Sequence, residues 1–155
     1  MMSTRSLVST LALCSVAVVV GIAADAHMGT WKLNEAKSKL GSGMPRNHTV
    51  VYASAGDSIK VTVDGTDGSG KPLHSEWTGK FDGKDYAVTG DPVTEMRSYK
   101  RVDDHTLALT GKKAGKITQT GTIVVSPDGK TRTVTITGIA ATGEKATGTA
   151  VYDKG

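Results

Sequence analysis

The stretch Gly29-Thr30-Trp31-Lys32-Leu33-Asn34 decides the fold that we expect for this chain. It places a tryptophan on what we predict to be the first strand, two residues after a glycine. A tryptophan side chain has a large apolar surface, which is buried only if later segments return to cover it. The question for the rest of the sequence is therefore whether it supplies strands that pack against Trp31.

The remainder of the chain is patterned as short strands joined by tight turns. From residue 46 onward, segments rich in Val, Ile, Thr and Tyr alternate with Gly, Asp, Ser and Pro at intervals of roughly 8 to 15 residues, which is typical of an antiparallel meander. Pairs such as Asp67-Gly68 and Asp82-Gly83 favour β-hairpin turns. We expect residues 35–45 to form a loop or a short helix. Strands are predicted at 29–34, 47–54, 58–65, 72–81, 85–89, 94–102, 105–111, 116–126, 131–138 and 145–153.

Alternation of apolar and polar residues gives each predicted strand one dry face. In residues 58–64, for example, Ile59, Val61 and Val63 point one way and their neighbours the other. No helix is predicted to cover this face, so the sheet must close on itself or fold into a sandwich. Because sequential hairpins join the strands, we predict an all-β fold, an up-and-down antiparallel β-barrel of about 8–10 strands. The inward set predicted for residues 116–126 is Ile117, Gln119, Gly121, Ile123 and Val125.

Small residues are frequent in the last predicted strands, where Thr, Ala and Gly occupy many positions. They either pack tightly in a flattened barrel or leave an internal cavity. An enclosed void of about 300 Å³ or more favours a carrier of a small molecule, whereas a filled core favours a protein that acts through its surface. The sequence leaves both arrangements open.

The first 26 residues have the pattern of a secretory signal peptide. Arg5 precedes an apolar run from Leu7 to Ile22, and Ala24-Asp25-Ala26 fits a small-x-small cleavage site. The alternative is a membrane anchor, for which the run is slightly short because a span needs about 20 apolar residues. We therefore expect residues 1–26 to be removed on export, leaving no membrane span, and residues 27–155 to form a single periplasmic or secreted domain.

The mature chain predicted in this way has no cysteine, since Cys14 lies in the leader, so no disulfide stabilises it. The whole chain carries 19 Lys and Arg against 15 Asp and Glu, a formal net charge of +4. The basic residues are scattered and aromatic residues are few, so neither a phosphate-binding stripe nor a base-stacking platform is indicated. We expect a monomer that binds no nucleic acid.

The opening Gly29-Thr30-Trp31-Lys32-Leu33 resembles the first strand of the calycins, the group that contains the lipocalins and the fatty-acid-binding proteins. This resemblance implies that Trp31, with Gly29 before it, closes one end of the barrel. The number of predicted strands and the final Val151-Tyr152-Asp153-Lys154 look more like the fatty-acid-binding branch. Residues 35–45 are too few for the helix-turn-helix lid of that branch, and Ala150 stands where it has a carboxylate-binding Arg. The chain also looks like small exported bacterial proteins of lipocalin-like type, and the resemblance implies an apolar or amphipathic ligand.

Three polar residues alternate along one predicted strand and therefore share a face: Arg97, Tyr99 and Arg101. If that face is internal, they form an anion clamp, because a buried guanidinium needs a carboxylate or phosphate partner. If it is external, they are ordinary solvated residues. Arg132 is in phase with inward residues of its own strand, so it either covers Trp31 at the end of the barrel or lies at the strand's exposed edge.

Any ligand is expected above the end that Trp31 closes, where Val61, Trp77, Tyr99 and Ile136 would surround it together with the arginines. The leading hypothesis is an exported barrel that binds or carries a small hydrophobic or amphipathic molecule. The alternative is a non-enzymatic envelope or extracellular interaction module, or an inhibitor, with a filled core. Such a module would act through the hairpin tips at 82–84 and 127–130.

No constellation of residues indicates catalysis, a metal site or a cofactor. The four histidines lie on separate predicted elements, with no two at ligand spacing. Asp103-Asp104-His105 is explained by turn chemistry, and Asp64 to Gly68 by a hairpin tip that lacks the spaced acidic ligands of a calcium loop. No nucleophile elbow, phosphate loop or His-Glu-x-x-His sequence occurs. We therefore expect no enzymatic activity, no metal and no cofactor.

Overall fold

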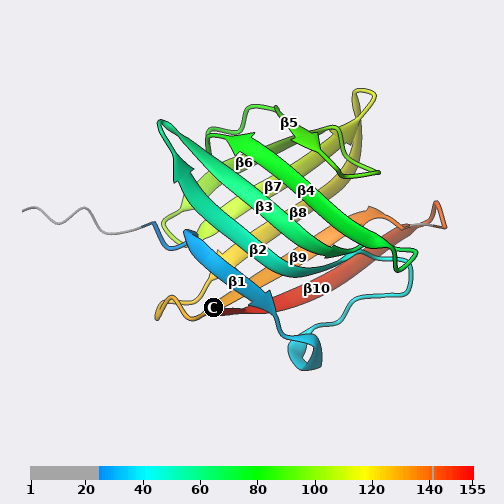
Figure 1. The fold of residues 1–155 in the computed structure, drawn as a ribbon, viewed down its shortest axis with the longest axis horizontal. Coiled ribbons are helices and arrows are strands. Elements are labelled where there is room, and N and C mark those ends of the chain that lie inside the picture. Colours follow the sequence, from blue (N-terminus) through cyan, green and yellow to red (C-terminus); the bar gives the residue numbers. More distant parts are fainter. Residues whose placement is uncertain (1–24, 141) are drawn as a thin grey trace, which may run out of the picture.

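Ten antiparallel strands close into one barrel in the computed structural model, which describes residues 25–140 and 142–155 (Figure 1). The predicted signal peptide lies outside the described residues except for its last two, Asp25 and Ala26. The strands are β1 (Gly29–Leu33), β2 (Arg46–Ala55), β3 (Ser58–Thr66), β4 (Pro72–Gly79), β5 (Tyr86–Thr89), β6 (Met96–Asp103), β7 (Thr106–Lys113), β8 (Lys116–Val125), β9 (Thr131–Ile139) and β10 (Lys145–Lys154).

Each strand pairs with the next one along the chain, and β10 pairs with β1 to close the ring. In Figure 1 the blue β1 therefore lies beside the red β10. Trp31 is held between Val50 of β2 and Lys154 of β10. The predicted up-and-down barrel is confirmed, and each predicted strand falls on one observed strand.

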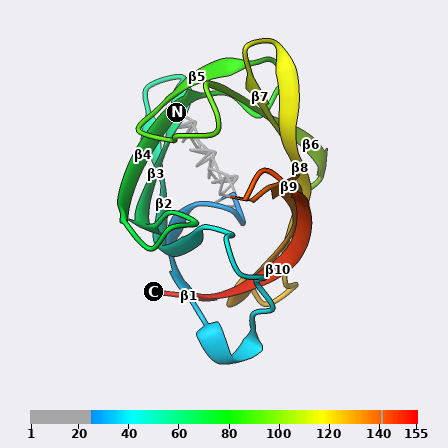
Figure 2. The same ribbon diagram turned by 90° about the vertical axis from the view of Figure 1, so that its right-hand side faces the viewer.

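The segment between β1 and β2 is a short 3-10 helix, η1 (Glu35–Lys37), followed by residues 38–45, which we call the strap. Asn34 caps η1 through its side-chain oxygen, which accepts a hydrogen bond from the Lys37 amide at 3.1 Å. Lys39 then forms a bridge with Thr149 of β10, with backbone hydrogen bonds of 2.7 and 2.9 Å. Figure 2, which looks along the barrel, shows the strap leaving β10 and crossing towards β2.

The two ends of the barrel differ in what fills them. At the end near Trp31, which we call the closed end, Trp31, His27 and Leu107 are fully buried. The Trp31 indole nitrogen donates a hydrogen bond of 2.9 Å to the carbonyl oxygen of His27. At the opposite end, which we call the open end, residues of the strap and of the β3–β4, β5–β6 and β9–β10 turns surround one pocket.

Aromatic side chains fill the middle of the barrel. Trp77 and Tyr99 meet edge to face, with ring centroids 4.7 Å apart, and Tyr52 and Phe81 pack around them. Such edge-to-face pairs stabilise a core beyond the burial of their surface. The barrel is therefore packed, and not hollow, from this aromatic cluster to the closed end.

One residue of β8 that was predicted to point inward, Ile117, points outward. Ile117 is 61% exposed. Gly111 of β7 pairs with Gln119, but Lys112 pairs with Ile117, so Thr118 is an extra residue in β8. This bulge reverses the alternation at the start of the strand. Ile123 and Val125, beyond the bulge, are buried as predicted.

Candidate functional site

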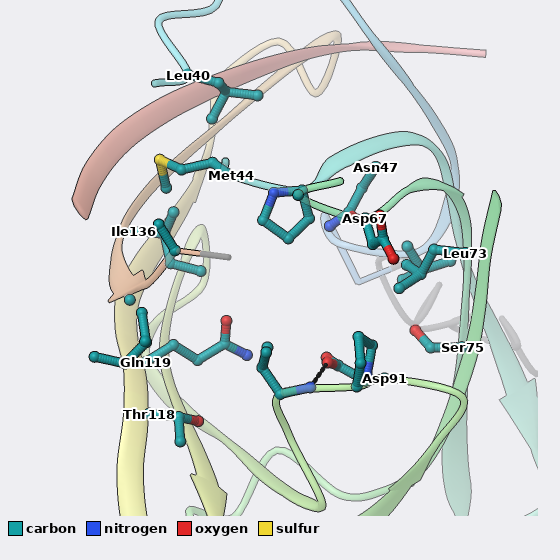
Figure 3. Close-up of a pocket in the computed structure, with 18 of the residues that line it drawn as sticks. Leu40, Met44, Asn47, Asp67, Leu73, Ser75, Asp91, Thr118, Gln119 and Ile136 are labelled. Carbon is teal, nitrogen blue, oxygen red and sulfur yellow. Dashed lines mark hydrogen bonds between the residues drawn. The ribbon is translucent and has the colours of Figure 1, made fainter. Parts of the chain in front are cut away.

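A pocket of about 260 Å³ lies at the open end of the barrel (Figure 3). The strap forms one wall of the pocket, and strands β4, β8, β9 and β10 together with the β3–β4 and β5–β6 turns supply most of the rest. Its apolar side chains include Leu40, Met44, Val63, Leu73, Ile136 and Ala150.

The pocket ends above the aromatic cluster. Val63 of β3 and Ser75 of β4, which are paired across the two strands, line it, but the next inward pair, Val61 and Trp77, does not. Tyr99 is also buried without lining the pocket. Of the predicted ligand residues, Arg97 and Ile136 therefore line the pocket, whereas Val61, Trp77 and Tyr99 belong to the packed core beneath it.

Glycines make room for the polar side chain of Gln119, which faces the pocket. Gln119 on β8 lies between Gly111 of β7 and Gly138 of β9. A Cβ atom at Gly111 would come within 2.5 Å of the Gln119 side chain, and one at Gly138 within 3.3 Å. The small residues of the last strands thus serve both close packing and the opening of the pocket.

The strap is seated on another glycine. A Cβ atom at Gly148 of β10 would lie 2.9 Å from Met44 Sδ and 3.0 Å from Leu40 Cδ2. The two side chains can lie against β10 only because Gly148 has none. Met44 is consequently buried.

Arg97 lies inside the barrel and is 8% exposed. Its Nη2 donates a hydrogen bond of 2.9 Å to Oδ2 of Asp91, in the β5–β6 turn. The Arg97 carbonyl accepts a hydrogen bond of 2.9 Å from the Trp77 indole nitrogen. The guanidinium is therefore neutralised by the chain's own carboxylate at the pocket wall.

Arg101 has its own carboxylate at the other end of the barrel. It forms an ion pair with Asp25, a residue of the segment predicted to be removed on export, and its guanidinium lies 5.3 Å from the centroid of the Phe81 ring. The face that Arg97, Tyr99 and Arg101 share is thus internal at Arg97 and Tyr99, but the structure does not bring the two guanidinium groups to one site.

Lys154, and not Arg132, covers Trp31. The Lys154 ammonium lies 4.4 Å from the centroid of a Trp31 ring and also donates a hydrogen bond to the Met28 carbonyl. Gly29 permits this approach, because it has φ of 108° and a Cβ atom there would lie 2.9 Å from Lys154. The cation over the Trp31 ring is thus Lys154, whereas Arg132 lies over the rings of Tyr52 and Tyr152.

Arg132 is buried at 4% exposure and lies between two tyrosines. Its Nη2 donates a hydrogen bond of 2.7 Å to the Tyr52 hydroxyl, and its Cζ lies 4.7 and 5.3 Å from the ring centroids of Tyr52 and Tyr152. Burial raises the pKa of the Tyr52 hydroxyl, so that hydroxyl stays protonated at neutral pH. Cation–π contacts stabilise the guanidinium here.

His27 is a second buried titratable group at the closed end. Its ring packs edge to face against Phe81. Burial lowers the pKa of His27 from 6.5 to about 4, with Asp25 opposing this effect and Arg132 adding to it. The ring is therefore neutral over the physiological pH range.

The sequence did not reveal the partner of Arg97 or the wall made by the strap. Asp91 falls between the strands predicted at 85–89 and 94–102, and Leu40 and Met44 fall in the segment predicted as a loop or a short helix. Gln119 was predicted to point inward, but nothing in the sequence marked it as a pocket residue. Asp103 does act as a turn residue, since its Oδ1 accepts a hydrogen bond of 2.9 Å from the His105 amide.

Within the described ranges, no three His, Cys, Asp or Glu side chains are arranged to hold a metal ion. No helix in that part of the chain is both long enough and apolar enough to cross a bilayer. Neither protein-family models nor curated proteins match the sequence. The fold and the pocket define the chain as an up-and-down antiparallel β-barrel, whose meander is consistent with that of the calycins.

Proposed function

We propose that this protein is an exported, calycin-like barrel that binds a small amphipathic molecule in the pocket at its open end. The observation that carries the proposal is the pocket itself, in which apolar side chains predominate and a few polar groups converge. The Gly-x-Trp opening on β1 and the packed closed end support the likeness to calycins. Export remains inferred from the pattern of residues 1–26.

The size of the pocket limits the ligand. Its volume of about 260 Å³ is slightly below the range of about 300–1,000 Å³ that is usual for drug-sized ligands. The packed aromatic cluster prevents a long chain from reaching further down the barrel. The proposed ligand is therefore short, with a single polar head and a compact apolar part.

Binding in the pocket is tested with a variant that fills it. We expect 1-octanol to bind the wild-type protein, as measured by isothermal titration calorimetry. Ile136→Trp should weaken this binding at least about tenfold, because the larger ring occupies the ligand's place.

The matched control is Thr135→Trp, which introduces the same side chain one residue away, on the exposed outer face of β9. It should leave the affinity for 1-octanol within about twofold of the wild type. Equal loss in both variants, or none in either, would show that the pocket is not the binding site.

The packed core between the aromatic cluster and the closed end favours an alternative to ligand binding, namely a module that acts through its surface. Its proposed contact points are the tips at residues 82–84 and 127–130. Both tips are ordered turns, in which Asp82 Oδ1 accepts from the Lys84 amide at 3.0 Å and Asp128 Oδ1 from the Lys130 amide at 3.0 Å. Purification from the native host, with Asp82→Ala and Asp128→Ala as comparison, tests it: a protein partner lost from these variants supports the module.

A further inference from the structure

The charge of the pocket is negative and not positive. Among the residues that the structure describes, three charged side chains line it, namely Asp67, Asp91 and Arg97. Two negative charges and one positive charge give a net charge of −1. An anionic ligand would therefore enter a pocket of its own sign.

The single cation of this set is already engaged. Arg97 Nη2 is 2.9 Å from Asp91 Oδ2, and the two side chains are only 10% and 12% exposed. The Val93 amide donates a hydrogen bond of 2.9 Å to the other oxygen of Asp91, the dashed contact in Figure 3, which fixes the carboxylate in place. A carboxylate ligand could bind Arg97 only by displacing Asp91, and this would leave a buried anion without a partner.

The other anion is satisfied by its own turn. Asp67 Oδ1 accepts hydrogen bonds from the Ser69 amide at 2.8 Å and the Lys71 amide at 3.0 Å. These backbone hydrogen bonds hold the Asp67 carboxylate in its turn, but they leave its negative charge uncompensated. Among the described side chains, the pocket therefore offers no unpaired cation for an anionic ligand.

What the pocket does offer is neutral hydrogen-bonding capacity. Figure 3 shows the side-chain amides of Asn47 and Gln119 reaching into the pocket from opposite sides. An uncharged hydroxyl or carbonyl group can form hydrogen bonds with these two amides without disturbing the ion pair.

We propose that the pocket selects uncharged amphiphiles, with a hydroxyl or carbonyl head and a short apolar tail, over the carboxylates of the same length. This inference rests on the proposed binding function and specifies its ligand class. It also separates the barrel from a fatty-acid carrier, since the internal carboxylate of Asp91 stands where a ligand's carboxylate would have to bind.

The experiment compares three eight-carbon ligands on the wild-type protein by isothermal titration calorimetry at neutral pH and constant ionic strength. They are 1-octanol, octanoate and octylamine. We expect 1-octanol to bind at least about tenfold more tightly than octanoate, and octanoate to be the weakest of the three ligands in a pocket of its own sign. If octanoate binds as tightly as either of the other two ligands, the inference is overturned while the binding function stands. If none of the three binds, the binding function fails and this inference with it.

A variant then tests the cause of the selectivity. Asp91→Asn removes the carboxylate that neutralises Arg97, so the affinity for octanoate should rise about tenfold or more relative to that for 1-octanol. Asp67→Asn is the matched control, because it changes the net charge of the pocket equally but releases no guanidinium. It should alter the ratio by no more than about threefold.

Two outcomes of this variant experiment contradict the inference: an unchanged ratio in a folded Asp91→Asn protein, and an equal change in both variants. Circular dichroism establishes that the variants are folded. If Asp91→Asn does not fold, the order of the three ligands on the wild-type protein decides the question alone.

Discussion

Gly29 and Trp31 act together through a third residue, Lys154, which is remote in sequence. The absence of a side chain at Gly29 allows the lysine to cross β1 and place its ammonium over the indole ring. The Gly-x-Trp spacing of this chain thus has a local physical explanation. A side chain at position 29 would have to adopt a backbone conformation that L-residues rarely populate.

Replacing Trp31 by Ala should lower the free energy of unfolding by about 3–5 kcal/mol, because a fully buried ring is lost from the closed end. Urea denaturation followed by circular dichroism measures this change. Ile117→Ala serves as control and should cost less than about 1 kcal/mol, because Ile117 is largely exposed. A similarly small cost at Trp31 would mean that the indole does not stabilise the barrel.

Replacing Gly29 by Ala should lower the free energy of unfolding by about 1–3 kcal/mol, chiefly because its φ of 108° is strained for alanine. The same denaturation measurement applies. Gly41→Ala is the control, since Gly41 has no positive φ and a Cβ atom there would meet only Met44 Sδ, at 4.0 Å. Equal stability of the two variants would contradict this account of the motif.

The buried His27 should make the barrel less stable in mild acid. Its pKa is about 4 in the folded state and 6.5 when unperturbed, so above pH 6.5 the ring is neutral in both states. As the pH falls from 6.5 towards 4, His27 binds a proton in the unfolded chain but not in the folded chain. This costs up to about 3 kcal/mol of stability, at about 1.4 kcal/mol for each unit of pKa difference.

Measurement of the unfolding free energy between pH 7 and pH 4 tests this prediction against His27→Phe. The phenylalanine variant should lose less stability over that range, because it has no group to protonate. Parallel curves for the two proteins would show that His27 does not carry the pH dependence.

At the scale of the strand, alternation predicts the architecture well and fails where a strand gains a residue. All ten strands were predicted because turn residues and period-two patterns are local signals. The bulge at Thr118 carries no such signal, because it depends on how β8 pairs with β7, and so Ile117 was assigned to the wrong face. Alternation also leaves the burial of Arg97 undecided. A guanidinium is buried only beside a carboxylate partner, and the strand pattern does not show that the fold brings one to it.

The strap should pack less tightly against β10 when Gly148 is replaced by a residue with a side chain. Gly148→Val would push against Leu40 and Met44, so Met44 should be oxidised by hydrogen peroxide at least about threefold faster than in the wild type. Peptide mass spectrometry measures the rate. Thr147→Val, on the exposed side of the same strand, should leave it unchanged. An unaltered rate in Gly148→Val would mean that the strap does not depend on this glycine.

At the scale of the whole molecule, the candidate site combines segments that are far apart in sequence, and this limits what could be predicted. Ile136 was identified because it lies in an inward phase on its strand, and Arg97 because it shares one face of a strand with Tyr99 and Arg101. Asp91 and Met44 were not, because a turn and a linker have no periodicity that fixes where their side chains point. Trp77 lies inside, as its phase predicts, and Tyr99 lies inside on a face whose orientation the sequence leaves open. Alternation does not show how far along the barrel axis the packed core extends.

The contrast between the two ends of the barrel has a kinetic consequence. With the closed end packed, a ligand that enters beside the strap must leave by the same passage. Constraining the strap, without altering the pocket beneath it, would then slow association and dissociation by the same factor. Residence time would lengthen while Kd stayed the same, so for this barrel the duration of binding and its strength can be adjusted independently.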